Sequence, residues 1–473
     1  MAAAAWLGKL PTRYLTPRGW GLFGAGVLAL LLAQLLGRRD LLGLGIFLAC
    51  LPVAAALAML LLKPRFAVER RFRPAAVETG VATSVRLSIQ GSGSGGGPVF
   101  MSENLPARFG RPPAFRFPAR HPDRSGASVY EYRLRSGKRG LFGIGPVTAE
   151  FADPFGLARQ RHNLGEVSRL IVTPAPVELP GTSLTGARGP DGTASTRRQT
   201  NPSDDDVMTR EYRYGDPMRR VHWAATARQG ELMVRQEESV TTPQATIVLD
   251  RRDAAFAGFL PAPAAGQAGD LLRTSPRFEW AVTAAVSAAN DFILRGYNVR
   301  LLDAHGAPGL RDSPSAAWPD DDEFSGPAGY QDLAEGLAAL GLAEEPRRKA
   351  DRADGAAGAF GDRLLDKLAA HKLKGPLLAV LGELSLAEAG QLAPAAEFGS
   401  QAFALLVVEH PRQPAGSLEK ALEKLRSGGW RAVAVSAQAS LPAAWSCFDI
   451  QGPVFEGSAR GSAGHAPTPE VHL

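Results

Sequence analysis

Residues 208–238 hold the densest set of side chains that could do chemistry: MTREYRYGDPMRRVHWAATARQGELMVRQEE. Guanidinium groups pair with carboxylates in a bidentate geometry, tryptophan is a common anchor of binding interfaces, and histidine titrates near neutral pH. The candidate residues of this signature segment (208–242) are Arg210, Glu211, Tyr212, Gly215, Asp216, Arg219, Arg220, His222, Trp223, Arg228, Leu232 and Arg235.

Three interpretations of the signature segment are compatible with these residues. The first is structural: apolar side chains pack under a sheet, a Gly-Asp-Pro turn reverses the chain, and arginines pair with nearby carboxylates. A half-buried network of that kind fixes geometry and is costly to break. It would pack Tyr212, Trp223, Leu232 and Val234, turn at Gly215, Asp216 and Pro217, and pair Arg219, Arg220 and Arg228 with Glu211, Asp216 and Glu231.

The second interpretation is a docking face for an acidic segment of a partner protein, with Trp223 as its aromatic anchor. Its positive charge would come from Arg210, Arg219, Arg220 and Arg228. The third interpretation makes His222 the catalytic base of a membrane-bound hydrolase or peptidase. No serine or cysteine nucleophile motif accompanies this histidine, so the sequence favours the first two interpretations.

Other motifs of known chemistry do not occur in the sequence. It contains no P-loop, H-E-x-x-H, C-x-x-C or G-x-S-x-G pattern. The run GSGSGGG (91–97) formally matches G-x-G-x-x-G at Gly91, Gly93 and Gly96, but no helical pattern follows it. We therefore expect no catalytic residue set and no cofactor, and we predict a non-enzymatic protein.

The composition narrows the class of partner. The formal net charge is +6 and the pI is near 9.4, but much of the excess lies beside two apolar segments. No basic run with interleaved aromatic residues occurs, so nucleic acid is not an expected partner. The two cysteines, Cys50 and Cys447, are not expected to meet and give no disulfide framework.

Two apolar runs near the N-terminus have the length that a helix needs to cross a bilayer. Residues 20–36 read WGLFGAGVLALLLAQLL, and residues 41–62 read LLGLGIFLACLPVAAALAMLLL. Only Gly-Arg-Arg-Asp (37–40) separates them, which predicts a tight transmembrane hairpin with a kink at Pro52. A cleaved signal peptide is the alternative for the first run, but a second span follows at once.

Flanking charge predicts the orientation of this hairpin. Basic residues precede the first run and follow the second, whereas the tip carries only Arg38 and Arg39. The positive-inside rule therefore places both termini and the soluble part in the cytoplasm, with two helices in the cell membrane. The flanking residues, which also suit anionic lipid head groups, are Lys9, Arg13, Arg18, Lys63, Arg65, Arg70, Arg71 and Arg73.

Residues 66–175 alternate apolar and polar side chains as half-buried strands do. The alternating runs are VATSVRLSI (81–89), SVYEYRL (128–134) and GPVTAEF (145–151). The stretches RGLFGIGP (139–146) and DPFGL (153–157) are typical of tight turns. This part of the chain is expected to form an antiparallel, β-sandwich-like domain.

From residue 245 onward, apolar strand runs alternate with helical patterns, which predicts an α/β domain with a mostly parallel sheet. The expected strands are 245–250, 298–304, 377–383, 402–409 and 430–436. Helices are expected over 279–297 and 417–429. The first of these has an apolar side made of Val282, Ala285, Val286, Ala289, Phe292 and Ile293.

The sequence thus predicts a multidomain chain. Its expected parts are a cytoplasmic N-terminus (1–19), a transmembrane helical hairpin (20–62), a β-sandwich-like domain (63–179), a flexible linker (180–207), the signature segment (208–242), an α/β domain (243–452) and a disordered tail (453–473). Loop-like insertions are expected within the α/β domain at 305–328 and 344–358.

The order R-E-Y-x-x-G-D-x-x-R-x-V-H-W-x-A-x-A-R-x-G-E-L-x-V-R, from Arg210 to Arg235, resembles the signature of the bacterial domain-of-unknown-function family 58. The G-R-R-D hairpin tip and the R-G-x-x-x-x-G-P and D-P-F-G-L turns also resemble that family, so the resemblance covers nearly the whole chain. One departure is Ala224, where relatives usually carry Lys or Arg. The resemblance implies a C-terminal domain similar to the von Willebrand factor type A fold.

The same resemblance bears on a metal site. Type A domains that bind Mg²⁺ present oxygen ligands in a D-x-S-x-S pattern after the first strand. Here the strand ends at Asp250, and Arg252 and Ala254 stand where the two serines would be. A guanidinium would occupy the place of the ion. We therefore expect a degenerate site without metal, in which Asp250 pairs with an arginine.

The proteins with which members of this family are associated suggest what the chain does. The resemblance implies association with MoxR-type AAA ATPases and with transglutaminase-like membrane proteins. Combined with the hairpin and the signature segment, this predicts a membrane-anchored, non-enzymatic adaptor or scaffold for envelope-related assembly. A membrane-bound hydrolase or peptidase that uses His222 is the alternative.

Overall fold

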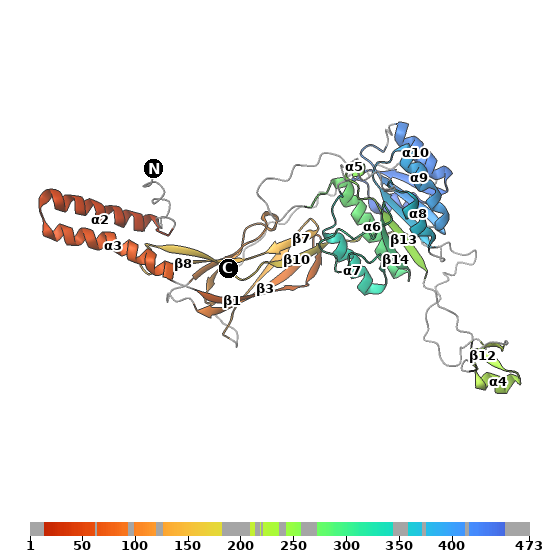
Figure 1. The fold of residues 1–473 in the computed structure, drawn as a ribbon, viewed down its shortest axis with the longest axis horizontal. Helices are drawn as coiled ribbons and strands as arrows, with labels where there is room; N and C mark the ends of the chain where they lie inside the picture. Colours follow the sequence, from red (N-terminus) through yellow and green to blue (C-terminus); the bar gives the residue numbers. More distant parts are fainter. Residues whose placement is uncertain are drawn as a thin grey trace, which may run out of the picture.

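The structure is a computed structural model in which a helical hairpin, a β unit, a signature unit and an α/β unit follow one another along the chain (Figure 1). The described residues are 14–61, 64–92, 99–119, 126–181, 209–212, 218, 221–235, 243–256, 272–343, 358–370, 375–411 and 416–449, without the side chains of 92, 209, 210, 224 and 235. Most of the expected linker, most of the insertion at 344–358 and the tail at 453–473 lie outside these residues.

The hairpin confirms two apolar helices near the N-terminus, α2 (Pro17–Leu36) and α3 (Arg39–Leu61), each long and apolar enough to cross a membrane. Helix α2 starts three residues earlier than expected, because the Thr16 hydroxyl accepts a hydrogen bond from the Gly19 amide at 3.2 Å. Gly37 ends it in the left-handed conformation, with φ of 64°. Large apolar side chains point outward, as Leu35 shows with 82% exposure.

Small residues bring the two helices together. The buried positions of α2 are seven residues apart, at Gly19, Gly26 and Ala33. A Cβ added at Gly26 would lie 2.6 Å from the backbone nitrogen of Ala49 on α3. Close backbone approach at small residues is the usual way in which helices associate in lipid.

Replacing Gly26 by leucine will therefore push the helices apart and destabilise the hairpin by about 1–3 kcal/mol. Gly21, on the same helix, has no heavy atom within 4 Å of an added Cβ, so Gly21→Leu is the matched control. The measurement is thermal unfolding of the full chain in detergent micelles. Equal melting temperatures for the two variants would contradict this packing.

The β unit (residues 64–181) contains three sheets. Their strand orders are β1-β3-β6, β2-β10-β7 and β5-β4-β8-β9. The strands are β1 (Arg65–Arg73), β2 (Ala76–Glu78), β3 (Ala82–Ser92), β4 (Val99–Glu103), β5 (Ala114–Phe117), β6 (Ser128–Arg135), β7 (Gly140–Ile144), β8 (Val147–Ala152), β9 (Arg159–Leu164) and β10 (Ser168–Thr173), with a 3-10 turn at Ala107–Phe109. The expected strands at 81–89, 128–134 and 145–151 are confirmed, although β2 pairs with β10 in parallel.

A buried ion pair connects two of these sheets. The Arg70 guanidinium on β1 donates to the Glu103 carboxylate on β4 at 2.6 Å, and the two side chains are 2% and 0% exposed. The Tyr132 hydroxyl on β6 donates to the same carboxylate at 3.0 Å. Burial, with the negative charge of Glu103, raises the pKa of Tyr132. Gly145 leaves room for Arg70, because a Cβ there would meet its guanidinium at 2.6 Å.

The α/β unit (residues 243–449) is built on a six-stranded sheet in the order β15-β14-β13-β16-β17-β18. All neighbouring pairs are parallel except β14 with the edge strand β15. The strands are β13 (Gln244–Leu249), β14 (Asn298–Asp303), β15 (Glu323–Phe324), β16 (Pro376–Leu381), β17 (Gln401–Val407) and β18 (Trp430–Val435). This confirms the expected mostly parallel sheet.

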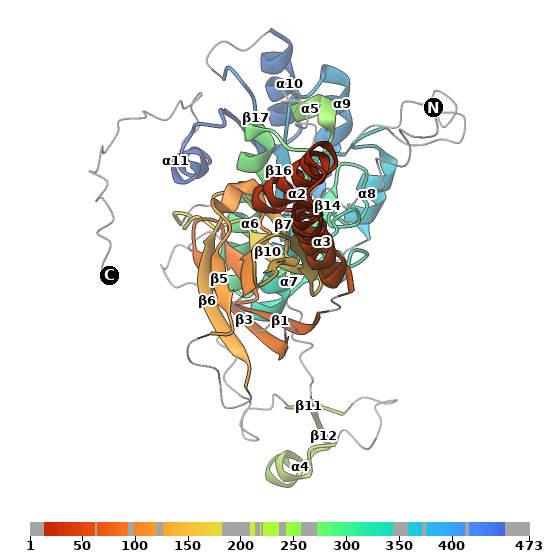
Figure 2. The ribbon, with the colours of Figure 1, turned by 90° about the vertical axis from the view of Figure 1, so that its left-hand side faces the viewer.

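Helices cover both faces of this sheet (Figures 1 and 2). One apolar core lies between the sheet and α6 (Pro276–Leu294), α7 (Gly326–Ala338) and α11 (Leu441–Ser446). The other core lies between the sheet and α8 (Asp362–Ala369), α9 (Leu386–Leu392), the 3-10 helix Ala393–Phe398 and α10 (Gly416–Ser427). Along β13, Ile247 and Leu249 enter the first core and Val248 the second, as strand geometry requires.

Arg139 joins the β unit to the α/β unit. This residue directly precedes β7, and its side chain is 2% exposed. Its guanidinium donates to the Glu279 carboxylate on α6 at 2.9 and 3.0 Å, and to the carbonyl oxygens of Leu337 and Leu340 at 2.6 and 2.8 Å. Burial lowers the pKa of Arg139, and the Glu279 charge opposes that shift. The R-G-x-x-x-x-G-P stretch (139–146) was expected to be a turn; it instead contains strand β7 and carries a joint between two units.

Candidate functional site

The carboxyl edge of the six-stranded sheet collects chemically capable side chains from distant parts of the chain. Strand β13 has β14 on one side and β16 on the other, so the direction of winding reverses between β13 and β16. In open α/β sheets, ligand sites lie outside the carboxyl ends of the strands at such a reversal. Asp250 directly follows β13 at this point, and Glu383 lies just beyond β16.

Asp250 and Arg252 form the centre of this edge. The Asp250 side chain is 0% exposed, and both its oxygens accept hydrogen bonds from the Arg252 guanidinium, at 3.0 and 2.9 Å. Arg252 also donates to the Glu388 carboxylate at the start of α9 (Leu386–Leu392), and it lies 5.0 Å from the centroid of the Phe360 ring. The expected pairing of Asp250 with an arginine is therefore found, and its partner is Arg252.

Glu388 has two functions at this position. Its carboxylate forms a capping box with Ser385 at the start of α9, and it also accepts from Arg252. Burial opposes its ionisation, but the hydrogen bonds from Ser385 and the charge of Arg252 outweigh burial and lower its pKa. The ionised form of Glu388 is thus the one that the fold stabilises.

This lowered pKa predicts a pH dependence. A carboxyl group whose pKa falls on folding contributes stability above its unfolded pKa of about 4.3 and loses that contribution as the pH drops through the folded pKa. Urea titrations of the full chain in detergent between pH 6 and pH 3 will show this loss. Glu388→Gln should flatten the curve in the acid range, and an unchanged slope would contradict the assignment.

Two further arginines fill the surroundings of Asp250. The Arg251 guanidinium donates to the Asp312 carboxylate at 3.2 Å and to the carbonyl oxygens of Gly341 and Gly309 at 3.3 and 3.4 Å. The Arg277 guanidinium on α6 donates to Glu383 at 2.5 Å. These carboxylates are paired with buried guanidinium groups, and such charge-assisted pairs fix the geometry of the loops that carry them.

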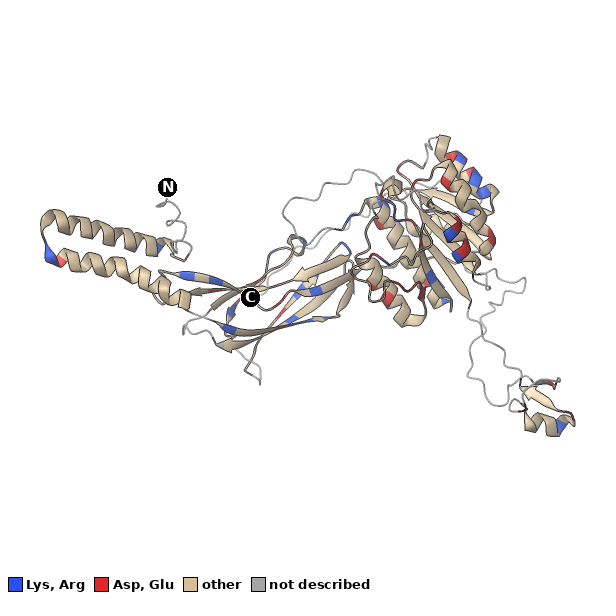
Figure 3. Ribbon diagram, in the orientation of Figure 1, with Lys and Arg blue, Asp and Glu red and all other residues tan. Residues whose placement is uncertain are grey.

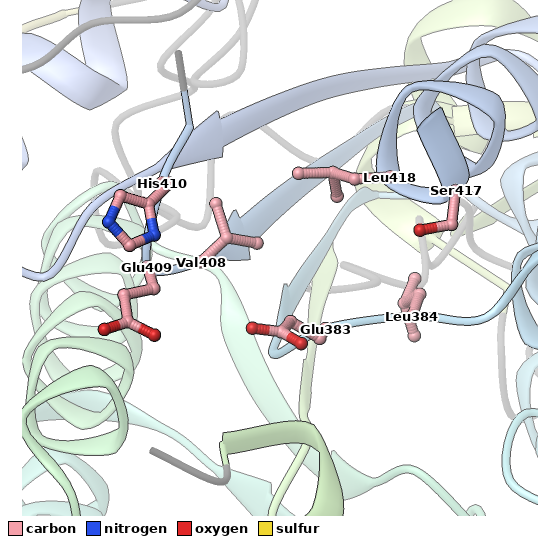
Figure 4. A pocket seen from close by; sticks show the side chains of 7 residues that line it. All are labelled: Glu383, Leu384, Val408, Glu409, His410, Ser417 and Leu418. Carbon is pink, nitrogen blue, oxygen red and sulfur yellow. The ribbon is translucent and has the colours of Figure 1, made fainter. Parts of the chain in front are cut away.

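A shallow hollow of about 210 Å³ lies beside this cluster, at the ends of β16 and β17. Figure 4 shows carboxylates from two neighbouring strand ends, Glu383 and Glu409, with the His410 imidazole next to the second. Leu384, Val408, Ser417 and Leu418 complete the lining. Within the described part of the chain, no group of three or more His, Cys, Asp or Glu residues is arranged to hold a metal ion.

The signature unit (residues 209–235) is a small ββ pair with one helix. Strands β11 (Thr209–Glu211) and β12 (Met233–Arg235) pair in an antiparallel arrangement, with Arg210 opposite Val234. Helix α4 (Trp223–Gln229) connects to them, because the His222 amide donates to the Met233 carbonyl oxygen at 2.7 Å. Val221 bridges to Val234 through the backbone, and these two side chains are buried.

His222 caps helix α4. Its Nδ1 accepts a hydrogen bond from the Ala225 amide at 3.0 Å, the position at which Ser, Asp or Asn usually cap a helix. An imidazole used in this way has its proton on Nε2, and its Nδ1 lone pair is occupied. The structure thus gives His222 a structural partner at one of the two nitrogens that a catalytic base would use.

The apolar residues of the signature unit divide into buried and exposed sets. Met233 and Val234 are buried, and Tyr212 is half-buried. Trp223 and Leu232, which the structural interpretation packs under a sheet, are instead 64% and 38% exposed. That part of the structural interpretation is wrong, because both side chains lie open to solvent in this unit. Met218 is also exposed, at 53%.

The charged residues of the signature segment are only partly described. Glu211, Arg228 and Glu231 are exposed, and Glu211 has a partner. Arg210 and Arg235 lie on β11 and β12, although their side chains are outside the described part. Gly215, Asp216, Arg219 and Arg220 lie outside the described residues altogether, so the expected turn and two of the expected arginine pairs stay predictions.

Comparisons with known proteins place the signature in a family. Residues 208–257 match the model of the family described as "Protein of unknown function DUF58", which confirms the resemblance over that stretch. A search of curated proteins found no match to the chain.

Two solved structures show low similarity. The CARDB domain of a Pyrococcus furiosus protein, in complex with di-metal ions, is 13% identical; the match covers 24% of this chain and 89% of that domain, with a TM-score of 0.17. Cwp6 from Clostridium difficile is 7% identical; the match covers 81% of this chain and 56% of Cwp6, with a TM-score of 0.14. At these TM-scores neither structure informs the arrangement of this chain.

Proposed function

We propose that this chain, which carries a DUF58 family domain over residues 208–257, is a membrane-anchored, non-enzymatic adaptor that docks a partner protein through its signature unit. The hairpin would hold it in the cell membrane with the soluble units in the cytoplasm, as the flanking basic residues indicate. The α/β unit, with its mostly parallel sheet covered on both faces, would be a degenerate relative of von Willebrand factor type A domains.

One observation supports docking above the other interpretations: Trp223 is 64% exposed at the first position of α4. Met218 and Leu232 of the same small unit are also exposed. Large exposed apolar side chains rimmed by charge are typical of binding interfaces, and tryptophan is the residue most enriched at their energetic centres. The exposed Arg228, with Arg219 and Arg220 in the same segment, would select an acidic partner surface.

The β unit would serve as a rigid connector in this adaptor. Its joint to the α/β unit is the buried Arg139, and its joint to the hairpin includes the hydrogen bond from the Thr16 amide to the Leu157 carbonyl oxygen at 2.9 Å. The first joint lies in the R-G-x-x-x-x-G-P stretch and the second in the D-P-F-G-L turn. A connector fixed at both ends would hold the α/β unit at a set distance from the bilayer.

The partner class follows from the family resemblance: a MoxR-type AAA ATPase, with a transglutaminase-like membrane protein as a further member of the assembly. The test uses the full chain in detergent and a purified MoxR-type ATPase, with the dissociation constant measured by a surface-binding assay. Trp223→Ala should weaken binding about 30-fold, the effect of losing a hot-spot residue worth about 2 kcal/mol. Arg219→Glu combined with Arg220→Glu should abolish it.

Trp318 supplies the matched control. It is also 64% exposed but lies on the α/β unit, so Trp318→Ala should leave the dissociation constant unchanged. Binding that is indifferent to Trp223 and to both arginines would reject the docking face. Cleavage of an envelope substrate that is lost with His222→Ala would instead favour the hydrolase.

A further inference from the structure

The turn at residues 153–157 lies beside the start of the first apolar helix. Thr16, which caps α2, donates from its hydroxyl to the Gly156 carbonyl oxygen at 2.7 Å. The Arg159 amide donates to the Tyr14 carbonyl oxygen at 2.6 Å, and Leu15 forms a bridge with Ala158. The residues that enter α2 therefore bond to the backbone of the β8–β9 connection through an isolated antiparallel bridge.

The end of the second apolar helix meets the same hairpin. Ala56 and Met59 of α3 are buried in a cluster that includes Phe151, Ala158 and Leu164. Figure 1 shows β8 next to the last turns of α3. Both helix ends thus adjoin the β8–β9 turn, which places that turn at the level where the helices would leave the hydrocarbon.

The turn is shaped to present Phe155. The Asp153 carboxylate accepts hydrogen bonds from the amides of Phe155 and Ala158, at 2.9 and 2.5 Å, and Gly156 takes a φ of +68°. This arrangement fixes the backbone and leaves the Phe155 side chain 67% exposed. Covering an exposed phenylalanine ring contributes about 1.5–3 kcal/mol, so a surface that met this turn would be bound more tightly through Phe155.

Exposed basic residues lie near the β8–β9 turn and the adjoining helix ends. Arg18 is exposed in the first turn of α2, and Arg65 is exposed at the start of β1, four residues after α3. Arg159 and Arg161 on β9 are 48% and 66% exposed and share one acidic partner, Glu150. Figure 3 shows basic residues on the strands next to the helix ends. Aromatic and basic side chains together are the composition that suits the interface of an anionic bilayer.

We infer that the D-P-F-G-L turn is a third membrane contact, in which Phe155 enters the head-group region and the arginines bind anionic lipid. This inference rests on the proposed membrane anchor. The hairpin alone would allow the chain to rotate about the hairpin axis. A third contact with the bilayer would restrict that rotation and so fix which side of the β unit faces the membrane. The surface that covers the exposed Phe155 ring is thus a lipid bilayer.

The test places a fluorescent label at single cysteines in the full chain, with Cys50→Ser and Cys447→Ala as background. The labelled protein is reconstituted into vesicles that contain phosphatidylglycerol and phosphatidylcholine. Val167→Cys is the matched control, because Val167 is also apolar and 54% exposed but follows the far end of β9. Doxyl-labelled lipid should quench a label at Phe155→Cys about threefold more than the control, and aqueous iodide should quench it less.

A third label separates this inference from the anchor itself. Leu31 is 58% exposed in the middle of α2, so Leu31→Cys reports hairpin insertion. If lipid quenches Leu31→Cys but not Phe155→Cys, the turn contact is wrong and the anchor stands. If lipid quenches neither, the anchor proposal is wrong as well. A label at Phe155→Cys that is shielded from both quenchers would indicate a protein contact and would also overturn the inference.

Discussion

Arg139→Ala will uncouple the α/β unit from the β unit and destabilise the joint by about 3 kcal/mol. The change removes a side chain that is 2% exposed and takes its guanidinium donor away from the carbonyl oxygens of Leu337 and Leu340. These carbonyl oxygens lie in the last turn of helix α7 and just beyond it, where a positive charge interacts favourably with the helix dipole. The Glu279 side chain is 38% exposed, so water can solvate its charge after Arg139 is removed. The loss of stability is therefore near the lower end of the range for breaking a buried ion pair.

Hydrogen exchange gives the most direct measure of this effect. A local loss of about 3 kcal/mol corresponds to roughly a hundredfold fall in the protection of amides in α7, Gly326–Ala338. Arg135→Ala is the control, because Arg135 is an exposed arginine four residues earlier and at the end of β6. Equal protection of α7 in both variants would show that Arg139 is not what joins the two units.

Asp250→Leu will lower the free energy of unfolding by about 3–5 kcal/mol, because it leaves the Arg252 guanidinium buried without its bidentate acceptor. The Asp250 and Arg252 side chains are 0% and 6% exposed, so water cannot replace the lost partner. The double variant Asp250→Leu with Arg252→Met removes the buried charge as well. It should be more stable than Asp250→Leu alone, despite having more substitutions.

Urea unfolding of the full chain in detergent, followed by circular dichroism, completes this double-mutant cycle. Asp320→Leu is the control for an exposed pair: Arg311 and Asp320 are 50% and 79% exposed and 3.4 Å apart, and such pairs contribute about 0–1 kcal/mol. If the effects of Asp250→Leu and Arg252→Met simply add, the two residues do not act as a pair. The control also separates the cost of losing a charge from the cost of burying one.

Most of the secondary structure could be predicted from local pattern. The runs at 81–89, 298–304 and 402–409 became β3, β14 and β17 within a few residues. The face of α6 that was expected to be apolar is buried except for Ile293, which packs against the core in part. Helices α7, α8, α9 and α11 were not expected, because α8, α9 and α11 have eight residues or fewer and α7 opens with glycine and proline.

The candidate site was less predictable than the fold. Asp250 and Arg252 were singled out because the family resemblance implied a D-x-S-x-S metal motif after the first apolar strand, and these residues stand at its first and third positions. Glu388, the second acceptor of Arg252, lies 136 residues farther along the chain. Nothing local marks it except the Ser385–Glu388 capping box, which the sequence shows as a helix start and which gives no sign of an arginine partner.

The sequence by itself determined the two apolar helices, the alternation of the β strands, the parallel α/β order and the signature that identifies the family. These properties follow from periodicity and composition, which depend on neighbours along the chain. Only the tertiary structure decided that Arg139 meets Glu279, that His222 caps α4 and that Trp223 and Phe155 are exposed. Burial and ion pairing between distant residues depend on strand order and on how units join, and short-range pattern does not contain that information.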